Sequence, residues 1–232
     1  MKVGARTHAG KVRPNNEDGY LIRDRLLAVA DGMGGHKAGE VASAVALEVM
    51  GEYPFSQGQP ESDLRRAVQA AHERVRELAS QDPAMAGMGT TLTAALIGPD
   101  RVFVAHVGDS RLYRWRAGEL KLMTEDHSLA AELLRAGRID EETARRHPHR
   151  HALTRAVGIG HSLAVDVGSF PIEPGDGLLL CTDGLSALVD DEDILRILQA
   201  EPSAQAAADA LVDLALARGG VDNVTVVVAS PH

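Results

Sequence analysis

Aspartates adjoin glycines at three places where an apolar run of the sequence ends. These dipeptides are Asp31-Gly32, Gly108-Asp109 and Asp183-Gly184, and Asp222 stands just before a fourth apolar run at 224–229. Short apolar runs predict buried strands, so each aspartate is expected at a strand end. The glycines beside three of them leave the backbone open to a ligand. Carboxylates and free carbonyl oxygens are the ligands that hard divalent cations take.

A polar loop near the N-terminus adds an arginine to these acids. Arg13 precedes two adjacent carboxylates, Glu17 and Asp18, by four residues. Its guanidinium fork suits phosphate, whereas the carboxylates suit a cation. Alone, this loop would be interpreted as a solvated charged turn. Gathered at one sheet edge, the acids would repel one another unless two divalent ions, roughly 3.5–4 Å apart, neutralised them and generated a hydroxide. The residue set therefore predicts phosphoester hydrolysis.

Other phosphate chemistries fit the sequence less well. A dinucleotide-binding turn at 32–37 fails because Lys37 stands where the third glycine belongs, and no P-loop Gly-Lys precedes Ser or Thr. A cysteine phosphatase would need arginine six residues after Cys181, where Ala187 stands. An aspartyl-phosphate enzyme would need two aspartates separated by one residue at a strand end. Asp109-Ser-Arg111 and Asp183-Gly-Leu185 lack such a pair. A purely structural glycine turn after Asp31 stays open from that segment alone.

Composition limits the function classes. The 232 residues are 44% hydrophobic and 25% charged, and the net charge of −9 disfavours nucleic acid or an anionic membrane as partner. One cysteine fits a reducing compartment. No signal peptide or run of ~20 apolar residues is evident, so we expect a cytoplasmic protein. Without repeats or linkers, residues 1–232 are expected to form one domain.

Periodicity and turn residues predict alternating groups of strands and helices. Strands are expected at 2–8, 18–23, 26–30, 89–97, 101–107, 110–116, 119–123, 163–170, 178–182 and 224–229. Helices are expected at 38–50, 63–80, 129–136, 192–199 and 203–217. The short joins favour antiparallel pairing. Between them, a flap is expected at about 130–155, where His147, His149 and His151 could share a strand face and bind metal, although an exposed flap is favoured.

The motifs together resemble the metal-dependent serine/threonine phosphatases of the PP2C (PPM) family in their compact bacterial form. They are RPNNED at 13–18, ADGMGG at 30–35, MGTTL at 88–92, VGDSR at 107–111, LCTDG at 180–184 and DNVTV at 222–226. They stand in family order and span nearly the whole chain. The resemblance implies an α+β fold, a four-layer αββα sandwich with two central antiparallel sheets flanked by helices.

The resemblance also implies roles for individual residues. Asp31 should bridge two catalytic Mn²⁺ or Mg²⁺ ions, with the Gly32 carbonyl on the first ion and Asp183 and Asp222 on the second. Glu17 and Asp18 should act there too, one or both through water. Asp109 with Asp183 should form a weaker third site. Arg13 should hold the phosphate while the bridging hydroxide attacks phosphorus in line, without a phosphoenzyme.

Three positions depart from the family pattern. His8 stands where an acidic residue is frequent. Met33 stands where eukaryotic members carry a candidate acid histidine, so protonation of the leaving oxygen falls to metal-bound water or to His36. His151 occupies a flap position where a relative uses serine near the third metal.

The resemblance further implies phosphoserine and phosphothreonine proteins as substrates, and a bacterial Ser/Thr kinase whose action the enzyme reverses. A monomer is expected. Two alternatives share the fold: a non-catalytic binding module that has lost its metals, and an anti-sigma-pathway phosphatase. The carboxylates disfavour the first. Arg13 disfavours the second, because those enzymes usually lack it.

Overall fold

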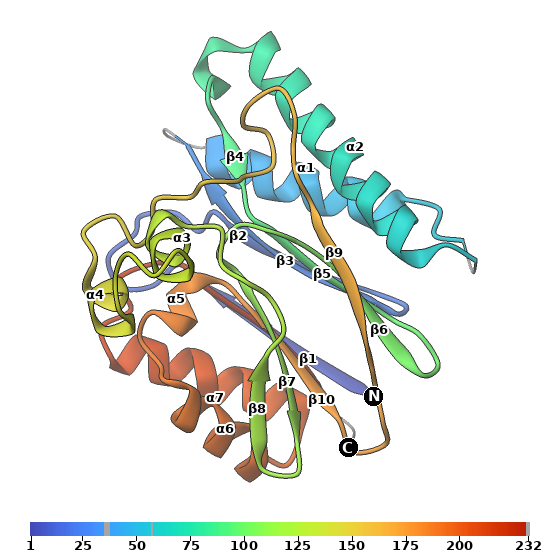
Figure 1. Ribbon diagram of the computed structural model, residues 1–232, viewed down its shortest axis with the longest axis vertical. Helices are drawn as coiled ribbons and strands as arrows, with labels where there is room; N and C mark the ends of the chain where they lie inside the picture. The colour runs from blue at the N-terminus through green and yellow to red at the C-terminus, as the bar shows by residue number, and fades with distance from the viewer. Residues whose placement is uncertain (35–37, 57, 231–232) are drawn as a thin grey trace.

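Two antiparallel β-sheets pack face to face at the centre of the molecule (Figure 1). The computed structural model describes residues 1–34, 38–56 and 58–230. The first sheet has the spatial order β1 (Lys2–His8), β11 (Val224–Ser230), β10 (Gly177–Cys181), β7 (Arg111–Arg116) and β8 (Glu119–Leu122). The second has the order β2 (Asp18–Arg23), β3 (Leu26–Met33), β5 (Leu92–Ile97), β6 (Arg101–Val107) and β9 (Asp166–Pro171), with β4 (Gly89–Thr90) paired to the end of β3.

Helices cover the outer faces of both sheets. The second sheet carries α1 (Ala38–Glu52) and α2 (Pro60–Gln81), which leads into the short helix η1 (Pro83–Met85). The first sheet carries α6 (Asp191–Ala200) and α7 (Ala204–Ala217), with α5 (Asp183–Ser186) at the end of β10. Figure 1 shows the resulting order of helices, sheet, sheet and helices. The predicted four-layer α+β sandwich is confirmed.

Three apolar layers hold this arrangement together. Between the sheets, alternate residues of facing strands interlock, among them Leu27 and Val29 of β3 against Leu178 and Leu180 of β10. On the outer faces, small residues of α1 and α7 let the helices lie close to the strands. Two apolar faces per sheet explain why β10 and β11 are apolar at nearly every position rather than at alternate ones.

The antiparallel pairing brings the predicted acidic positions to one edge of the sandwich. At that edge β3, β6 and β10 end while β2, β7 and β11 begin. The register places Asp18 directly opposite Asp31. The link from β6 to β7 passes from one sheet to the other at this edge and carries Asp109. Alternation of strand ends and starts thus collects residues from distant parts of the chain.

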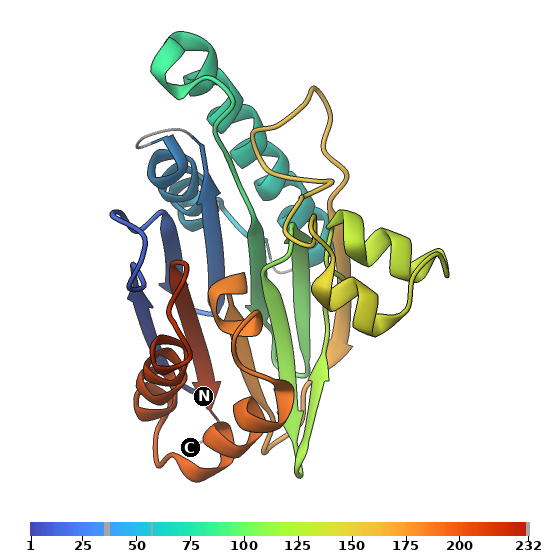
Figure 2. The ribbon, with the colours of Figure 1, turned by 90° about the vertical axis from the view of Figure 1, so that its left-hand side faces the viewer.

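The segment between β8 and β9 lies largely outside the sandwich. It contains α3 (Leu129–Arg135) and α4 (Glu141–Arg146), which stand out from the body of the molecule in Figure 2. The weak pattern of this region did not predict α4, whose first turn is capped by the Asp140 carboxylate, which accepts a hydrogen bond from Thr143 N at 2.8 Å. His147 is the C-cap residue of α4, and His149 and His151 lie in the turn that follows, so the three histidines do not share a strand face.

Element boundaries differ from the expectations at several points. β3 continues to Met33, so Asp31 lies within the strand rather than beyond it. The expected strand at 89–97 is interrupted at Thr91, whose side chain replaces a ladder partner by accepting a hydrogen bond from Asp31 N at 2.9 Å. α2 begins earlier, at Pro60, which suits the first helical turn. β9 begins later than predicted, at Asp166. Among the described residues no helix is long and apolar enough to cross a membrane.

Substitution in the central layer should destabilise the fold. Leu178 is fully buried between the sheets, so Leu178→Ala should lower the free energy of unfolding by about 2–5 kcal/mol through lost apolar contact and a residual cavity. Ile22→Ala, at a position on β2 that is 41% exposed, is the control and should change it by no more than about 0.5 kcal/mol. Denaturant unfolding in EDTA measures both, and equal losses would contradict this description of the core.

Candidate metal centre and phosphate pocket

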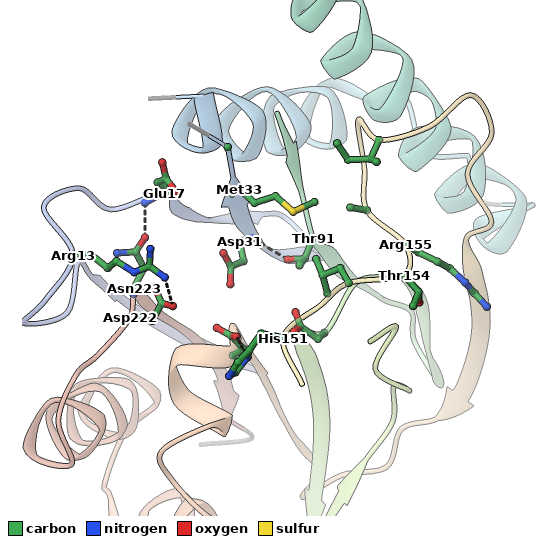
Figure 3. A pocket seen from close by; sticks show the side chains of 17 residues that line it. Arg13, Glu17, Asp31, Met33, Thr91, His151, Thr154, Arg155, Asp222 and Asn223 are labelled. Atoms are coloured by element: carbon green, nitrogen blue, oxygen red, sulfur yellow. Dashed lines mark hydrogen bonds and ion pairs between the residues drawn. The ribbon is translucent and has the colours of Figure 1, made fainter. Parts of the chain in front are cut away.

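A pocket of about 370 Å³ opens at the edge where the two sheets meet (Figure 3). Its acidic lining comes from both sheets and from the crossover between them. These residues are Glu17, Asp31, Asp109, Asp183 and Asp222. Arg13 lines the same pocket, as does Gly32. The structure therefore brings together the predicted cation ligands and the predicted phosphate-binding arginine, with Asp18 directly behind them.

Asp18 and Asp31 form the buried base of the acidic cluster. The Asp18 Oδ2 atom accepts a hydrogen bond from Thr182 Oγ1 at 2.8 Å, whereas its Oδ1 atom is buried without a hydrogen-bond partner. Burial, with repulsion from Asp183 and Asp222, raises the pKa of Asp18 to about 7. Burial and the neighbouring carboxylates hold the pKa of Asp31 well above its usual range. Both pKa values are raised because the ionised carboxylates would be buried close to other negative charges without a counter-ion.

Asp109 sits on the crossover turn, deeper than the rim of the pocket. Its side chain is largely buried, since the residue is only 8% exposed. Burial and repulsion from Asp183 raise the pKa of Asp109 to about 8. The preceding Gly108 has φ +111°, a conformation that favours glycine, and a Cβ there would overlap the Thr91 side chain. The turn therefore specifies glycine just before the carboxylate.

Two acids at the rim contact basic side chains. The Asp222 Oδ2 atom accepts a hydrogen bond from Arg13 Nη2 at 2.8 Å. The Asp183 Oδ2 atom lies 2.9 Å from Nδ1 of His151. These contacts raise the pKa values of the Arg13 and His151 side chains, in each case chiefly through the hydrogen bond to the aspartate. Arg13 is thus held at the pocket by one of the predicted metal ligands.

Backbone contacts fix the loop that carries Glu17. The Glu17 carbonyl accepts hydrogen bonds from Gly32 N at 3.1 Å and from Ser43 Oγ at 2.6 Å. Gly32 is also required sterically, because a Cβ there would lie 2.1 Å from the carbonyl oxygen of Gly39 in α1. Burial raises the pKa of the Glu17 carboxyl group. The glycine after Asp31 therefore allows α1, β3 and the acidic loop to meet closely.

Asn223 fixes the loop that carries Arg13, a role that was not predicted from the sequence. Its Oδ1 accepts a hydrogen bond from Glu17 N at 2.8 Å, and its Nδ2 donates to the carbonyl oxygens of Ala9 and Asn15 at 2.9 and 2.8 Å. One amide thus joins the start of β11 to both ends of the loop that carries Arg13. Its position next to Asp222 in the sequence is the signal that could have indicated this role.

A second network supports the Asp109 turn from behind. His127 Nδ1 accepts a hydrogen bond from Gly108 N at 3.1 Å, so its Nε2 carries the proton and donates to Asp166 Oδ2 at 3.0 Å. Arg155 Nη1 donates to the other oxygen of Asp166 at 2.7 Å. Burial lowers the pKa of His127. Arg155, at the end of the flap, and Asp166 are thereby connected to the turn that carries Asp109. These residues are far apart in the sequence, so the connection could not be predicted from it.

The remaining predicted positions contribute differently. His36 lies outside the described residues. His8 Nδ1 accepts a hydrogen bond from Gly10 N at 2.9 Å and does not line the pocket. Met33 lines it together with Ile159, and both side chains lie against Gly89. This apolar wall faces the acidic side of the pocket.

The donor set fits divalent cations. Buried carboxylates with raised pKa values and an unpartnered buried oxygen of Asp18 gain stability when a cation binds and displaces their protons. Oxygen ligands suit Mg²⁺ and Mn²⁺. Asp18, Asp31, Asp183 and Asp222 are close enough to perturb one another electrostatically.

Comparisons with known proteins agree with this site. The family model for protein phosphatase 2C matches residues 15–216. The serine/threonine protein phosphatase PstP of Mycobacterium tuberculosis is 43% identical over 99% of this chain, although the chain spans only 45% of that relative's length. The serine/threonine phosphatase stp of Listeria welshimeri is 38% identical, with 97% of this chain and 94% of the relative covered. The chain belongs to the protein phosphatase 2C family.

A solved structure of a relative contains metal. The catalytic domain of the serine/threonine protein phosphatase PstP in complex with two manganese ions is 42% identical, with a TM-score of 0.91 over 99% of this chain and 97% of that one. Metal dependence of the family fold therefore agrees with the carboxylate cluster described above.

The metal-free protein should lose stability as pH rises from 6.5 to 8.5. The folded pKa values of Asp18 and Asp109, about 7 and about 8, exceed those of unfolded aspartate. In this pH range the carboxyl groups of the native protein hold protons that the unfolded chain has released. Their contribution to the free energy of unfolding is therefore present at low pH and is lost as the pH rises through these two pKa values. The buried His106 and His127, whose pKa values are lowered, act with the opposite sign, but only below about pH 6.5.

Thermal melts in EDTA and in Mn²⁺ across this pH range test the prediction. Mn²⁺ at one hundred times its Kd should add about 2.7 kcal/mol per site that only the native state possesses, and the gain should grow with pH as the carboxyls ionise. Melting temperatures in EDTA that rise from pH 6.5 to 8.5, or curves that Mn²⁺ leaves unchanged, would contradict the cation-binding interpretation.

Proposed function

We propose that this chain is a protein serine/threonine phosphatase that hydrolyses phosphoserine and phosphothreonine with the help of two divalent ions. The observation that carries the proposal is the meeting of Arg13 with the buried carboxylate cluster in one pocket. A cation site alone would not require the arginine, and a phosphate site alone would not gather carboxylates. Together they suit a phosphate ester bound against metal ions.

The carboxylates are proposed to hold the ions. Asp31, which lies between the two sheets at the base of the pocket, would bridge both, the Gly32 carbonyl would bind the first, and Asp183 and Asp222 the second. Glu17 and Asp18 would complete the coordination, directly or through water. When bound, such ions lower the pKa of a coordinated water and neutralise charge on phosphoryl oxygens.

Arg13 is proposed to bind and orient the phosphate. Its side chain is half-exposed at the pocket rim, and Asp222 holds one nitrogen of the guanidinium. The remaining N–H groups can donate to phosphate oxygens as a pair. Proton delivery to the leaving oxygen falls to His36 or to water, because the Met33 side chain has no proton to donate.

The finer parts of the proposal rest on the family. They are Mn²⁺ or Mg²⁺ as the ions, a weaker third ion at Asp109 and Asp183, the flap at about 130–155 as part of one catalytic domain, and a monomer. The substrates would be phosphoproteins of an opposing bacterial Ser/Thr kinase, in the cytoplasm. The non-catalytic module and the anti-sigma-pathway phosphatase are less favoured, because the carboxylates and Arg13 are all present in the pocket.

Replacing the bridging aspartate should abolish turnover without unfolding the protein. Asp31→Asn should lower kcat more than about 100-fold, since even an outer-shell partner of a metal can cost 10–100-fold. The control is Asp100→Asn, at the exposed turn between β5 and β6 at the opposite end of the sandwich. Steady-state hydrolysis of a phosphothreonine peptide at saturating Mn²⁺ measures both. Turnover near wild type in Asp31→Asn would refute the two-metal proposal.

Replacing Arg13 should separate phosphate binding from metal binding. Charge-assisted hydrogen bonds contribute about 1.5–3 kcal/mol, so Arg13→Ala should lower kcat/KM at least about 10-fold. Arg13→Lys should fall between, because lysine keeps the charge but loses the fork. Mn²⁺ affinity should not fall, since the substitution removes a cation that competes for Asp222.

Arg6→Ala is the matched control for Arg13→Ala. Arg6 lies on β1 and pairs with Asp209 and Asp213 of α7, away from the pocket. Kinetics on phosphopeptides and calorimetric Mn²⁺ titration are measured for all variants. Full activity of Arg13→Ala would remove Arg13 from the proposed site and would leave the aspartate assignments standing.

A further inference from the structure

One buried threonine lies between the two acidic turns of the pocket. Thr91, between β4 and β5, is only 1% exposed, and it binds both backbone groups of Asp31. Its Oγ1 accepts a hydrogen bond from Asp31 N at 2.9 Å, and its own N donates to Asp31 O at 2.9 Å. Figure 3 shows Thr91 beside Asp31, joined to it by a dashed line. The peptide groups on both sides of the Asp31 side chain are therefore held by one residue.

The same threonine contacts both neighbours of Asp109. Its hydroxyl shares a hydrogen bond of 2.7 Å with the hydroxyl of Ser110, which is fully buried. Its Cγ2 methyl group would lie 2.5 Å from a Cβ at position 108, so the side chain packs directly against Gly108. Gly108 and Ser110 flank Asp109 in the crossover turn. Thr91 therefore contacts this turn on both sides of the Asp109 carboxylate.

The strand pairing is altered at this residue in a way that makes the contact possible. Thr91 lies opposite Asp31 in the register of β3 with β4 and β5. In a regular antiparallel pair the Thr91 carbonyl would accept the Asp31 N–H. That carbonyl instead accepts a hydrogen bond from Thr90 Oγ1 at 2.9 Å. The Thr91 hydroxyl takes its place beside Asp31, and a hydroxyl can bind a second partner on the Asp109 turn.

We propose that Thr91 is a positioning residue that fixes the Asp109 turn relative to Asp31, so that one buried hydroxyl sets the spacing of two carboxylates from different turns. This inference rests on the proposed function only in requiring that the acidic edge binds divalent ions. Repulsion from Asp109 contributes to the raised pKa of Asp31, and it tends to separate the two turns when both groups are ionised. The hydrogen bond between Thr91 and Ser110 opposes that separation. Ligands that are already in place lose less conformational freedom when an ion binds.

Thr124 is a matched control for Thr91. It is also buried, and its hydroxyl accepts a hydrogen bond from a strand backbone, Leu112 N, at 3.2 Å. It does not line the catalytic pocket. Thr91→Val and Thr124→Val each remove one hydroxyl and keep the branched shape, so both should lower the denaturant midpoint in EDTA. Only Thr91→Val should alter metal binding.

Calorimetric titration with Mn²⁺ in the absence of substrate measures that difference. Thr91→Val should weaken Mn²⁺ binding at least about 10-fold, as loss of a group that orients a metal ligand does. Thr124→Val should bind Mn²⁺ as the wild type does. Thr91→Ser keeps the hydroxyl and loses only the methyl group, so it should recover most of the affinity. A purely structural role of Thr91 predicts equal Mn²⁺ affinity in both valine variants, and that result would overturn the proposal.

Ser110→Ala tests the contact with the Asp109 turn alone, because Asp31 N keeps its bond to Thr91. It should weaken Mn²⁺ binding roughly 2- to 10-fold, the range that one hydrogen bond contributes. The double variant Thr91→Val/Ser110→Ala should bind no more weakly than Thr91→Val, since their shared bond can be lost only once. Additive losses would refute the link between the two turns. If Thr91→Val does not fold, Ser110→Ala decides, and an unchanged Mn²⁺ affinity in that variant would refute the link.

These titrations use no substrate, so they are separable from the proposed function. Mn²⁺ binding that depends on Thr91 and Ser110, without phosphopeptide hydrolysis by the wild type, would refute the phosphatase assignment and leave the positioning role standing. Phosphopeptide hydrolysis by an enzyme whose Mn²⁺ affinity is indifferent to both residues would do the reverse.

Discussion

Mutual repulsion of carboxylates at one edge of the sandwich is the constraint around which the rest of the site is arranged. Asp18 lies opposite Asp31, Asp31 is within electrostatic range of Asp109, and burial and repulsion raise the pKa values of all three. Among the residues that the structure describes, Arg13 and His151 contact acids of this cluster at its rim. Divalent cations supply what the interior lacks. A fold that retains so much uncompensated charge is organised for a cationic ligand rather than for maximal stability in its absence.

The antiparallel topology explains how such a cluster can form from distant parts of the chain. Each strand that ends at this edge is followed in space by one that begins there, so turns from residues 13 to 223 converge. Short polar side chains surround the acidic residues: Thr91, Thr182 and Asn223 form hydrogen bonds with their backbone or carboxylate groups. These contacts set the position of the charges, and the glycines at 32 and 108 allow the chains to approach closely enough.

Much of this could be predicted from the sequence, because strands, turns and aspartates at strand ends are local features. The four-layer fold followed from the family resemblance of the motifs. Contacts between distant residues could not be predicted: Arg13 with Asp222, the three hydrogen bonds of Asn223, and the path from Arg155 through Asp166 and His127 to Gly108. Helix α4 was missed because its stability comes from a capping aspartate and i,i+4 charge pairs rather than from an apolar stripe.

The carboxylates also come from two different sheets, with Asp18 and Asp31 on one, Asp183 and Asp222 beside the other, and Asp109 on the strand crossover. An ion coordinated by residues from both groups would link the two sheets directly. Sliding of one sheet over the other by even a fraction of a side chain would then distort the coordination before it exposed any apolar surface. Metal affinity would therefore depend on sheet alignment, and the apolar contacts between β3 and β10, which touch no ion themselves, would contribute to the chemistry by keeping the two layers in register.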